Sequence, residues 1–552
     1  MKMKEVQTSA STASLPRRSK DVKVDRNGVT CYDEEITNIV NYTYDFEITS
    51  PQAWTRATSA LLDAIGAGLE SITTSSELSQ IIGPNFPSPD TIPNGFKLPG
   101  TKYQLDMVKG AFDMGAMIRY LNHNDVYLGA EWTHPSDNLG AILSTADVLS
   151  RVASSNDDQD SILTMRHVLV ALIKAYEIQG CFQGKNAFNK AGLDDIILVK
   201  VASTAVVSWL MGLPKEQAKA AVSHAWVDGN PLRAYRQFPN VGPRKNWAAG
   251  DACMRAVQLA LMAKTGQAGV KTALSAPRCG FYDVLFRGNT FDLPRPFGTS
   301  VIENVFFKVY TTESHGMTAL EAALLTCTEL KERKLSVSDI KSIQSPSDRD
   351  HSLGYMIALT LLKSALPEPN DYQNTSSWSK DPRVEELRDK ITIREDAEFT
   401  RNYHDQDLRS LANAIRVTLN DDTKLDEIVI HFPQGHARRR ESLQLIEEKA
   451  RRNLGLQLSA RRIDTIFEKT KSMEFFGMSV SEFMDLFVPG WLAWRGGTCF
   501  WFLAWARAME RLRAGRVARR EYDGWVSDIW TEAGIQAFEI LGSSYMVILN
   551  GL

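Results

Sequence analysis

The sequence predicts a mainly α-helical protein, with a large all-helical domain and a smaller α+β domain. From residue 32 to about residue 300, apolar residues recur at helical spacing in one segment after another. From about residue 300 to residue 440, helical segments alternate with runs of β-branched and aromatic residues, which are typical of strands. A chain of 552 residues is also too long to fold around one small hydrophobic core, which favours more than one domain.

The helices expected in the first part are long, and several end in glycine, as helix C-termini often do. They cover residues 53–72, 108–121, 162–180, 198–213 and 252–266. In the second part, SVIENVFFKVY (300–310) and KLDEIVIHFP (424–433) are predicted as strands. After residue 440 the pattern is helical again, so we expect the chain to return to the first domain.

These patterns divide the chain into five predicted segments. They are a tail (1–30), the first part of the helical domain (31–303), the α+β domain (304–440), the return segment of the helical domain (441–487) and a C-terminal extension (488–552). The basic, Ser/Thr-rich tail resembles a mitochondrial transit peptide, and a plain disordered tail is the alternative, so both a mitochondrial and a cytoplasmic location stay open.

The C-terminal extension differs from the rest of the chain in composition. It holds six of the twelve tryptophans, many arginines and no lysine. An interfacial amphipathic helix, a packed extension and the product of a misplaced gene boundary would each account for this composition. Its role is left open.

The composition excludes several classes of partner. The formal net charge is −3, which gives no indication of nucleic acid or of an anionic membrane surface as a partner. No run of eighteen apolar residues predicts a membrane span. The six cysteines lie far apart, without a CxxC pair or zinc-ligand spacing, which favours unpaired thiols in a reducing compartment.

Four ionisable residues stand directly before or at the start of a predicted helix. They are His134, Lys245, His315 and His351, and Tyr355 follows His351 at i+4 on the same helix face. Helix N-termini carry unpaired N–H groups and a positive dipole end, so converging helix starts suit a di- or tricarboxylate anion. Each residue taken alone is more typical of an ordinary cap, a solvated surface or a core tyrosine.

Other familiar sites are missing from the sequence. No GxSxG elbow, P-loop or HExxH motif is present, and the glycines of DAIGAGLES lie inside a helical pattern with no strand before them. The arginines at 438–440, 451–452 and 461–462 favour a charged helix face over a ligand patch. Redox, phosphoryl-transfer and metallopeptidase chemistry therefore lack support.

Several longer motifs carry a family resemblance. They are EWTHPSDNLGAI (131–142), LRAYRQFPNVGPRKNWAAGDA (232–252), GFYDVLFRG (280–288), ESHGMTALEAA (313–323) and RNYHDQDLRSLANAI (401–415). In this order they resemble the MmgE/PrpD family, and within it the 2-methylcitrate dehydratases, from about residue 32 to residue 488. The resemblance implies a helical domain built from both ends of the chain, an α+β lid, a homodimer, and a cleft between the domains that takes a small tricarboxylate and no metal or other cofactor.

The resemblance also implies site residues. The residues that match the family's catalytic positions are His134, His315, Lys245, Tyr355 and Asp125. The neighbouring residues expected to bind the substrate are Ser136, Asp137, Asn138, Arg244, His351 and Asn122. We expect His134 and His315 to divide the base and acid roles, Lys245 to bind a carboxylate, and Tyr355 and Asp125 to orient the proton transfers.

The expected reaction is the dehydration of an alkylcitrate. A base removes a weakly acidic proton next to a carboxylate, and hydroxide leaves the neighbouring carbon. One positioned acid or base supplies only about 10²- to 10⁴-fold in rate. Fixed positive charge must therefore stabilise the enediolate-like transition state as well.

The chain departs from the family pattern at four positions. Asn122 stands where the family commonly has a carboxylate, and Cys279, Ser314 and Gly354 stand where larger residues are common. The loss of the carboxylate at 122 could weaken catalysis. The three small residues predict a wider pocket and a longer substrate, such as the alkylcitrates of fungal maleic anhydride biosynthesis. Housekeeping turnover of 2-methylcitrate in propionate breakdown is the close alternative.

Two further functions stay open. One is cis-aconitate decarboxylation, another activity of this family, although its members tend to lack the complete motif around His134 that is intact here. The other is an inactive paralogue that serves as a binding partner through the C-terminal extension. Product analysis distinguishes decarboxylation from dehydration, and a turnover assay distinguishes an inactive paralogue from an enzyme.

Overall fold

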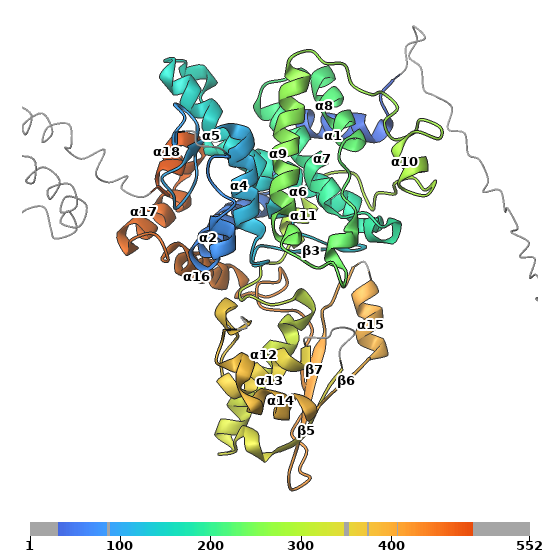
Figure 1. Cartoon of the computed structure of the whole chain (residues 1–552), viewed down its shortest axis with the longest axis vertical. Coiled ribbons are helices and arrows are strands. Elements are labelled where there is room, and N and C mark those ends of the chain that lie inside the picture. The colour runs from blue at the N-terminus through green and yellow to red at the C-terminus, as the bar shows by residue number, and fades with distance from the viewer. Residues whose placement is uncertain (1–30, 86–88, 347–352, 373–374, 406, 489–552) are drawn as a thin grey trace, which may run out of the picture. The chain divides into compact units, whose positions relative to one another are not determined.

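The computed structural model describes residues 31–85, 89–346, 353–372, 375–405 and 407–488. The predictions for residues 1–30, for 489–552 and for His351 lie outside these residues. Within them the chain is mainly helical, and its one larger sheet lies in the C-terminal part (Figure 1). The predicted fold class is confirmed.

The first part of the chain is a helical assembly with two short strand pairs. Its helices are α1 (Glu34–Asp45), α2 (Pro51–Thr74), α3 (Ser76–Ser79), α4 (Met107–Arg119), α5 (Leu139–Ser155), α6 (Met165–Lys185), α7 (Ile196–Leu210), α8 (Lys215–Val227), α9 (Arg244–Lys264), α10 (Phe281–Val284) and α11 (Ser300–Asn304). Its antiparallel pairs are β1 (Phe96–Lys97) with β2 (Gln104–Leu105), and β3 (Tyr127–Leu128) with β4 (Trp132–Thr133). The five helices predicted from apolar spacing are confirmed as α2, α4, α6, α7 and α9.

Local sequence signals set where these helices begin. The Ser50 side chain accepts a hydrogen bond from the backbone N–H of Ala53, and proline occupies the first position of α2. The Asp106 side chain caps α4 by accepting hydrogen bonds from the backbone N–H groups of Val108 and Lys109. Helix α7 is apolar around most of its circumference, and nearly all of its side chains are buried. It therefore forms the centre of the helical assembly.

Three glycines bring α4, α5 and α9 into backbone contact. A Cβ atom on Gly140 would lie 2.6 Å from the backbone nitrogen of Gly115, and one on Gly115 would lie 2.9 Å from Cα of Gly250. No side chain fits at these contacts, so the three helices approach at their glycines. The same contacts fix the ends of these helices that carry Arg119, the His134 motif and Lys245.

The second part of the chain is an α+β unit, which we call the lid. Its sheet has the order β6-β5-β7-β8, with β5 (Ile340–Pro346) parallel to β6 (Ile391–Arg394) and antiparallel to β7 (Asn413–Leu419), which pairs antiparallel with β8 (Ile428–Ile430). Its helices are α12 (Met317–Glu332), α13 (Leu353–Lys363), α14 (Pro382–Asp389) and α15 (Ala397–His404). Figure 1 shows α12, α13 and α14 beside the strands, and their apolar side chains form one core with the sheet.

The strand predictions succeed only in part. The segment 424–433 contains β8, but the segment 300–310 begins with helix α11, and only Phe306 forms an isolated bridge, to Val126. The prediction of a strand there was wrong. Val301, Ile302 and Phe307 are buried by helical neighbours, and this burial satisfies an apolar run as well as a sheet does.

The chain then returns to the helical assembly. Helices α16 (Ser442–Leu454), α17 (Ala460–Lys471) and α18 (Val480–Asp485) follow the lid, and α16 packs on α2 while α18 packs on α5. This arrangement agrees with the predicted return segment, and the boundaries at 303/304 and 440/441 stay predictions. Among the described residues, no helix is long and apolar enough to cross a membrane, and no disulfide joins the cysteines.

Candidate active site

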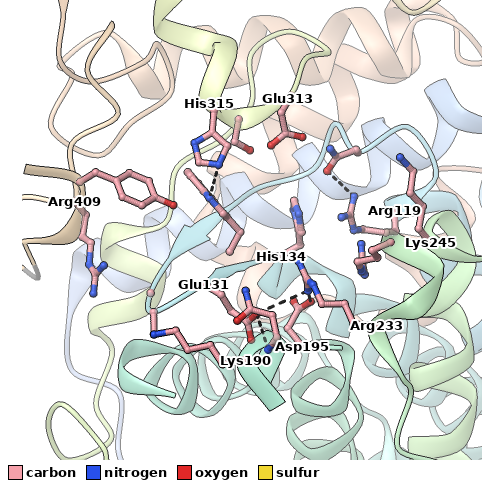
Figure 2. A pocket seen from close by; sticks show the side chains of 18 of the residues that line it. Arg119, Glu131, His134, Lys190, Asp195, Arg233, Lys245, Glu313, His315 and Arg409 are labelled. Atoms are coloured by element: carbon pink, nitrogen blue, oxygen red, sulfur yellow. Dashed lines mark hydrogen bonds and ion pairs between the residues drawn. The ribbon is translucent and has the colours of Figure 1, made fainter. Parts of the chain in front are cut away.

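A pocket of about 1180 Å³ is lined by residues of both the helical assembly and the lid (Figure 2). The helical assembly contributes Arg119, Asn122, Gly129, Ala130, Glu131, Trp132, His134, Asn189, Lys190, Asp195, Arg233, Arg236, Lys245 and Asn246. The lid contributes Glu313, Ser314, His315, Ile393, Tyr403, His404 and Arg409. These residues are distant in sequence, so the pocket exists only in the folded chain.

Four of the predicted site residues meet in this pocket: His134, Lys245, His315 and Asn122. Lys245 lies inside the first turn of α9, which begins at Arg244. His315 belongs to a short 3₁₀ helix, η5 (Ser314–Gly316), directly before α12. The structure therefore brings three of the four predicted helix starts together.

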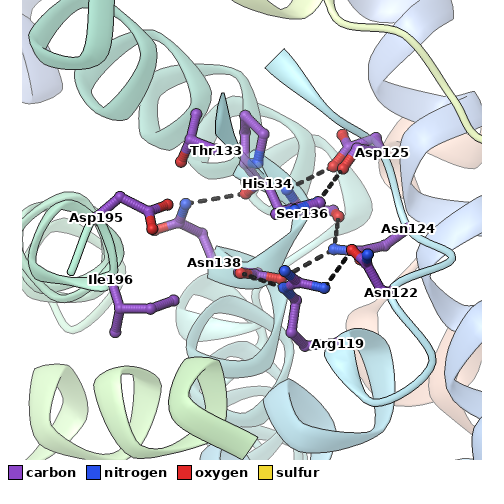
Figure 3. Close-up of polar contacts among 12 residues, drawn as sticks. Arg119, Asn122, Asn124, Asp125, Thr133, His134, Ser136, Asn138, Asp195 and Ile196 are labelled. Carbon is purple, nitrogen blue, oxygen red and sulfur yellow. Dashed lines mark hydrogen bonds and ion pairs between the residues drawn. The ribbon is translucent and has the colours of Figure 1, made fainter. Parts of the chain in front are cut away.

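His134 is held in one tautomer at the wall of the pocket. It precedes the 3₁₀ helix η1 (Pro135–Asn138), and its Nδ1 lies 2.8 Å from the backbone oxygen of Asp125 (Figure 3). A carbonyl oxygen only accepts hydrogen bonds, so Nδ1 carries the proton and Nε2 keeps its lone pair. Burial, together with the charges of Arg119 and Lys308, holds the pKa of His134 well below its ordinary value.

Asp125 holds the His134–Ser136 turn in place without lining the pocket. It is fully buried, accepts a hydrogen bond from the Ser136 N–H at 3.0 Å and one from the Tyr176 hydroxyl at 2.5 Å, and does not line the pocket. Its backbone and side chain thus fix both ends of the His134–Ser136 turn (Figure 3). Asp125 positions His134, and the structure does not bring its carboxylate to a substrate.

Three residues predicted to bind substrate are also buried behind the pocket. Ser136 and Asp137 accept hydrogen bonds from the Asn124 amide, both at 2.9 Å. Asn138 donates to the backbone oxygen of Pro135 at 2.9 Å and accepts from the Ser203 hydroxyl at 2.7 Å. None of the three lines the pocket, because their polar atoms hold the η1 turn against its neighbours.

Other predicted residues lie elsewhere. Arg244 stacks on the Trp247 ring, 4.5 Å from its centroid, and pairs with Asp251 at 3.2 Å, outside the pocket lining. Tyr355 is half-buried in the lid on α13, where burial and the nearby Asp371 and Glu385 carboxylates raise its pKa. The structure does not bring Tyr355 to His134.

The three small residues that predicted a wider pocket are not together. Ser314 lines the pocket, whereas Cys279 is exposed outside the lining and Gly354 faces Arg388 on α14. Of the three small residues, only Ser314 can therefore widen the pocket.

His315 is oriented by a tryptophan. The indole N–H of Trp132 donates to Nε2 of His315 at 3.0 Å, and the two rings pack edge to face with centroids 5.1 Å apart. An indole N–H only donates, so Nε2 of His315 accepts and its proton sits on Nδ1. Trp132 lies two residues before His134, so the short strand β4 that leads into His134 also orients the His315 imidazole.

Four arginines of the pocket escaped the sequence analysis: Arg119, Arg233, Arg236 and Arg409. Three of them are paired with acids: Arg119 with Asp137 (3.6 Å), Arg233 with Glu131 (3.8 Å) and Asp195 (3.9 Å), and Arg236 with Asp194 (3.1 Å). Arg233 and Arg236 belong to the 3₁₀ helix η4 (Arg233–Arg236), where an i, i+3 pair shares one face. That spacing was a signal in the sequence, because two cations on one helix face suit an anion.

Lys308 is a further cation that the sequence analysis missed. It is fully buried, and its ammonium donates to the backbone oxygens of Asn122 (2.9 Å) and Thr312 (3.2 Å). Burial, opposed by Glu313, lowers its pKa to about 7. A lysine inside the apolar run VFFKVY was the available signal. Lys308 thus holds the backbone of Asn122, which lines the pocket, and that of Thr312.

The pocket can bind an anion and accept a proton beside it. Six cationic side chains line it against three acidic ones, and the unprotonated nitrogen of His134 is placed among them. Among the described residues, no group of three or more His, Cys, Asp or Glu side chains could hold a metal ion. The arrangement suits proton removal next to a bound carboxylate.

Comparison with known proteins agrees with this chemistry. The chain is 56% identical over 484 residues to a 2-methylcitrate dehydratase-like protein of Aspergillus oryzae, covering 84% of this chain and 97% of that protein. It is 43% identical over 477 residues to an alkylcitrate dehydratase of a fungal species, covering 83% and 94%. It is 41% identical over 504 residues to a mitochondrial 2-methylcitrate dehydratase of Yarrowia lipolytica, covering 87% and 95%.

Two family models also match, and they account for both parts of the fold. The MmgE/PrpD N-terminal domain matches residues 37–294, which form most of the helical assembly. The MmgE/PrpD C-terminal domain matches residues 343–472, which include most of the lid and helices α16 and α17. The chain belongs to the MmgE/PrpD family.

Proposed function

We propose that this protein is a hydro-lyase that removes water from 2-methylcitrate or a longer-chain alkylcitrate to form the corresponding alkyl-aconitate. One observation carries the proposal: a buried, neutral histidine presents its unprotonated nitrogen to a pocket rich in cations. The names of the relatives support the same reaction.

The geometry suggests how the roles divide. Nε2 of His134 removes the proton from the carbon next to a substrate carboxylate, and the electrons move to form the double bond as the neighbouring C–O bond breaks. Arg119, Arg236 and Lys245 bind carboxylates and stabilise the negative charge that develops on them. His315, whose Nδ1 bears the proton, donates that proton to the leaving hydroxyl group, which departs as water.

The size of the pocket favours a substrate longer than 2-methylcitrate. Its volume of about 1180 Å³ exceeds the range of about 300–1,000 Å³ that is usual for pockets that hold drug-sized ligands. We infer that an alkyl chain extends through it, as in the biosynthesis of a fungal secondary metabolite. The housekeeping role in propionate breakdown is the second candidate, and the relative from Yarrowia supports it by name.

The assembly and the compartment belong to the same proposal. We infer a homodimer, which size-exclusion chromatography with light scattering tests directly. A mitochondrial location is supported by the mitochondrial relative and by the composition of residues 1–30, and a cytoplasmic one is the alternative. Imaging of the full chain with a C-terminal fluorescent tag separates the two.

The function is tested by a mass-spectrometric time course with purified full-length protein. The substrates are 2-methylcitrate, a long-chain alkylcitrate and cis-aconitate. Faster loss of water from the long-chain compound supports a biosynthetic dehydratase, whereas preference for 2-methylcitrate supports propionate metabolism. Release of CO₂ from cis-aconitate would indicate the decarboxylase, and no turnover of any compound would indicate the inactive paralogue.

The low pKa of His134 predicts activity that persists at acidic pH. A group whose pKa is lowered takes up its proton only at lower pH, so the base form of His134 remains present below pH 6.5. We expect kcat at saturating substrate to change by less than about twofold between pH 8 and pH 6. The measurement is initial rate from the ultraviolet absorbance of the conjugated product. A severalfold fall in kcat centred near pH 6.5 would mean that the base has an ordinary imidazole pKa.

A further inference from the structure

The pocket has two cationic ends. Figure 2 shows Arg119 and Lys245 at one end, next to His134, and Arg409 and Lys190 on the opposite side. Lys190 belongs to the 3₁₀ helix η3 (Phe188–Ala191) of the helical assembly, and Arg409 follows α15 of the lid. The second end is remote from the proposed base, so it is not needed to bind the reacting carboxylates.

Aromatic side chains separate the two ends. The rings of Trp132, His315 and Tyr403 contact one another, with centroids 5.1 Å, 5.7 Å and 6.3 Å apart. Burial lowers the pKa of the Arg409 guanidinium, and the nearby Tyr127, Tyr403 and Asp405 side chains oppose this shift. Trp132, His315 and Tyr403 thus form a continuous aromatic stretch of the pocket lining, which ends near Arg409. An alkyl chain fits against such faces.

Lys190 and Arg409, the cations at the far end, differ from the other arginines of the pocket in their ion pairs. Arg233 and Arg236 are each paired with a buried acid, whereas no acidic side chain in the described parts of the chain forms an ion pair with Lys190 or Arg409. Arg409 is half-buried, so its guanidinium has lost part of its hydration; the nearby Asp405 attracts it without forming an ion pair, and the Asp405 carboxylate accepts hydrogen bonds from the backbone N–H groups of Asp407 and Leu408. A cation in this state is compensated by a ligand that carries negative charge.

We propose that the far end of the pocket binds a carboxylate at the end of the substrate's alkyl chain, so that the preferred substrate is an alkylcitrate with a terminal carboxyl group. This inference rests on the proposed function and specifies its substrate. A methyl-terminated chain of the same length would place apolar carbon against the half-buried Arg409 guanidinium and would gain no compensating contact there or with the exposed Lys190 ammonium. The two ends of the pocket would then hold the two acidic ends of one molecule.

The test compares matched substrates and matched variants of the full-length protein. The substrates are alkylcitrates of increasing chain length, each made with a methyl end and with a carboxylate end. The variants are Arg409→Gln and Lys190→Gln. The charge control is Arg401→Gln, an exposed arginine of α15 that does not line the pocket.

We expect each pocket variant to raise KM for the carboxylate-ended substrate by about tenfold or more, which is the usual effect of losing a charged hydrogen bond. KM for the methyl-ended substrate should change less than about twofold, and Arg401→Gln should leave both values unchanged. Arg409→Lys retains the charge and should recover most of the loss.

The outcomes separate this inference from the proposed function. Equal kcat/KM for the two chain ends, or an equal effect of Arg409→Gln on both substrates, would overturn the distal carboxylate site while leaving the dehydratase intact. Failure of every citrate to lose water would overturn the proposed function itself.

Discussion

Replacing His134 by asparagine is expected to lower kcat at least about a hundredfold, because the proposed base is removed. An asparagine side chain can still donate its amide N–H to the backbone oxygen of Asp125, as Nδ1 of His134 does at 2.8 Å. It has no basic nitrogen to replace Nε2. The substitution therefore separates the loss of the base from the loss of the η1 turn, and the measurement is kcat under saturating substrate.

His404→Asn is the matched control for this variant. His404 also lines the pocket, but it lies at the exposed end of α15, where no proton transfer is proposed. We expect its kcat with 2-methylcitrate to stay within about threefold of the unmodified protein. Thermal unfolding of both variants checks that the fold is retained. Near-normal turnover by His134→Asn would rule out His134 as the base.

Replacing Lys449 by methionine is expected to destabilise the protein by about 3–5 kcal/mol, the cost of leaving a buried charge without its partner. Lys449 lies on α16 and is almost completely buried, with its ammonium 2.8 Å from the Asp63 carboxylate on α2 and 2.6 Å from the backbone oxygen of His123. It joins the return segment to the loop that carries Asn122 and Asp125. The measurement is the free energy of unfolding in urea.

Lys471→Met provides the comparison at an exposed ion pair. Lys471 pairs with Glu447 at 3.0 Å, but its side chain is 63% exposed, so we expect a loss below about 1 kcal/mol. The double variant Lys449→Met, Asp63→Asn should recover part of the loss, because the uncompensated charge is gone. A destabilisation by Lys449→Met no greater than that of Lys471→Met would contradict the buried-pair interpretation.

The stability lost in Lys449→Met should depend on pH in a defined direction. Burial raises the pKa of Asp63 to about 6 even with Lys449 beside it, and removal of the lysine raises this pKa further. A carboxyl whose pKa is raised in the folded state destabilises that state once the pH exceeds its unfolded pKa. The loss caused by Lys449→Met should therefore be smaller at pH 6 than at pH 8.

Much of the fold could be predicted because helix formation has a local signature. Apolar spacing located α2, α4, α6, α7 and α9, whereas Gly180, at the predicted end of a helix, lies inside α6. The segment 300–310 misled the analysis because an apolar run records burial, and burial by helices or by a sheet produces the same run. The glycines at 115, 140 and 250 could be read from the sequence, but their mutual contact depends on how three helices cross.

The sequence by itself determined the family, the imidazoles of His134 and His315, and Lys245, because these residues stand in contiguous motifs whose order is fixed along the chain. Only the tertiary structure decided which side chains share the pocket. It placed Ser136, Asp137 and Asn138 behind the wall, kept Tyr355 in the lid, and brought Arg119, Arg236 and Arg409 to one cavity. The physical reason is that hydrophobic patterns specify which face of an element is buried, whereas the lining of a pocket depends on long-range packing between elements that the local pattern does not encode.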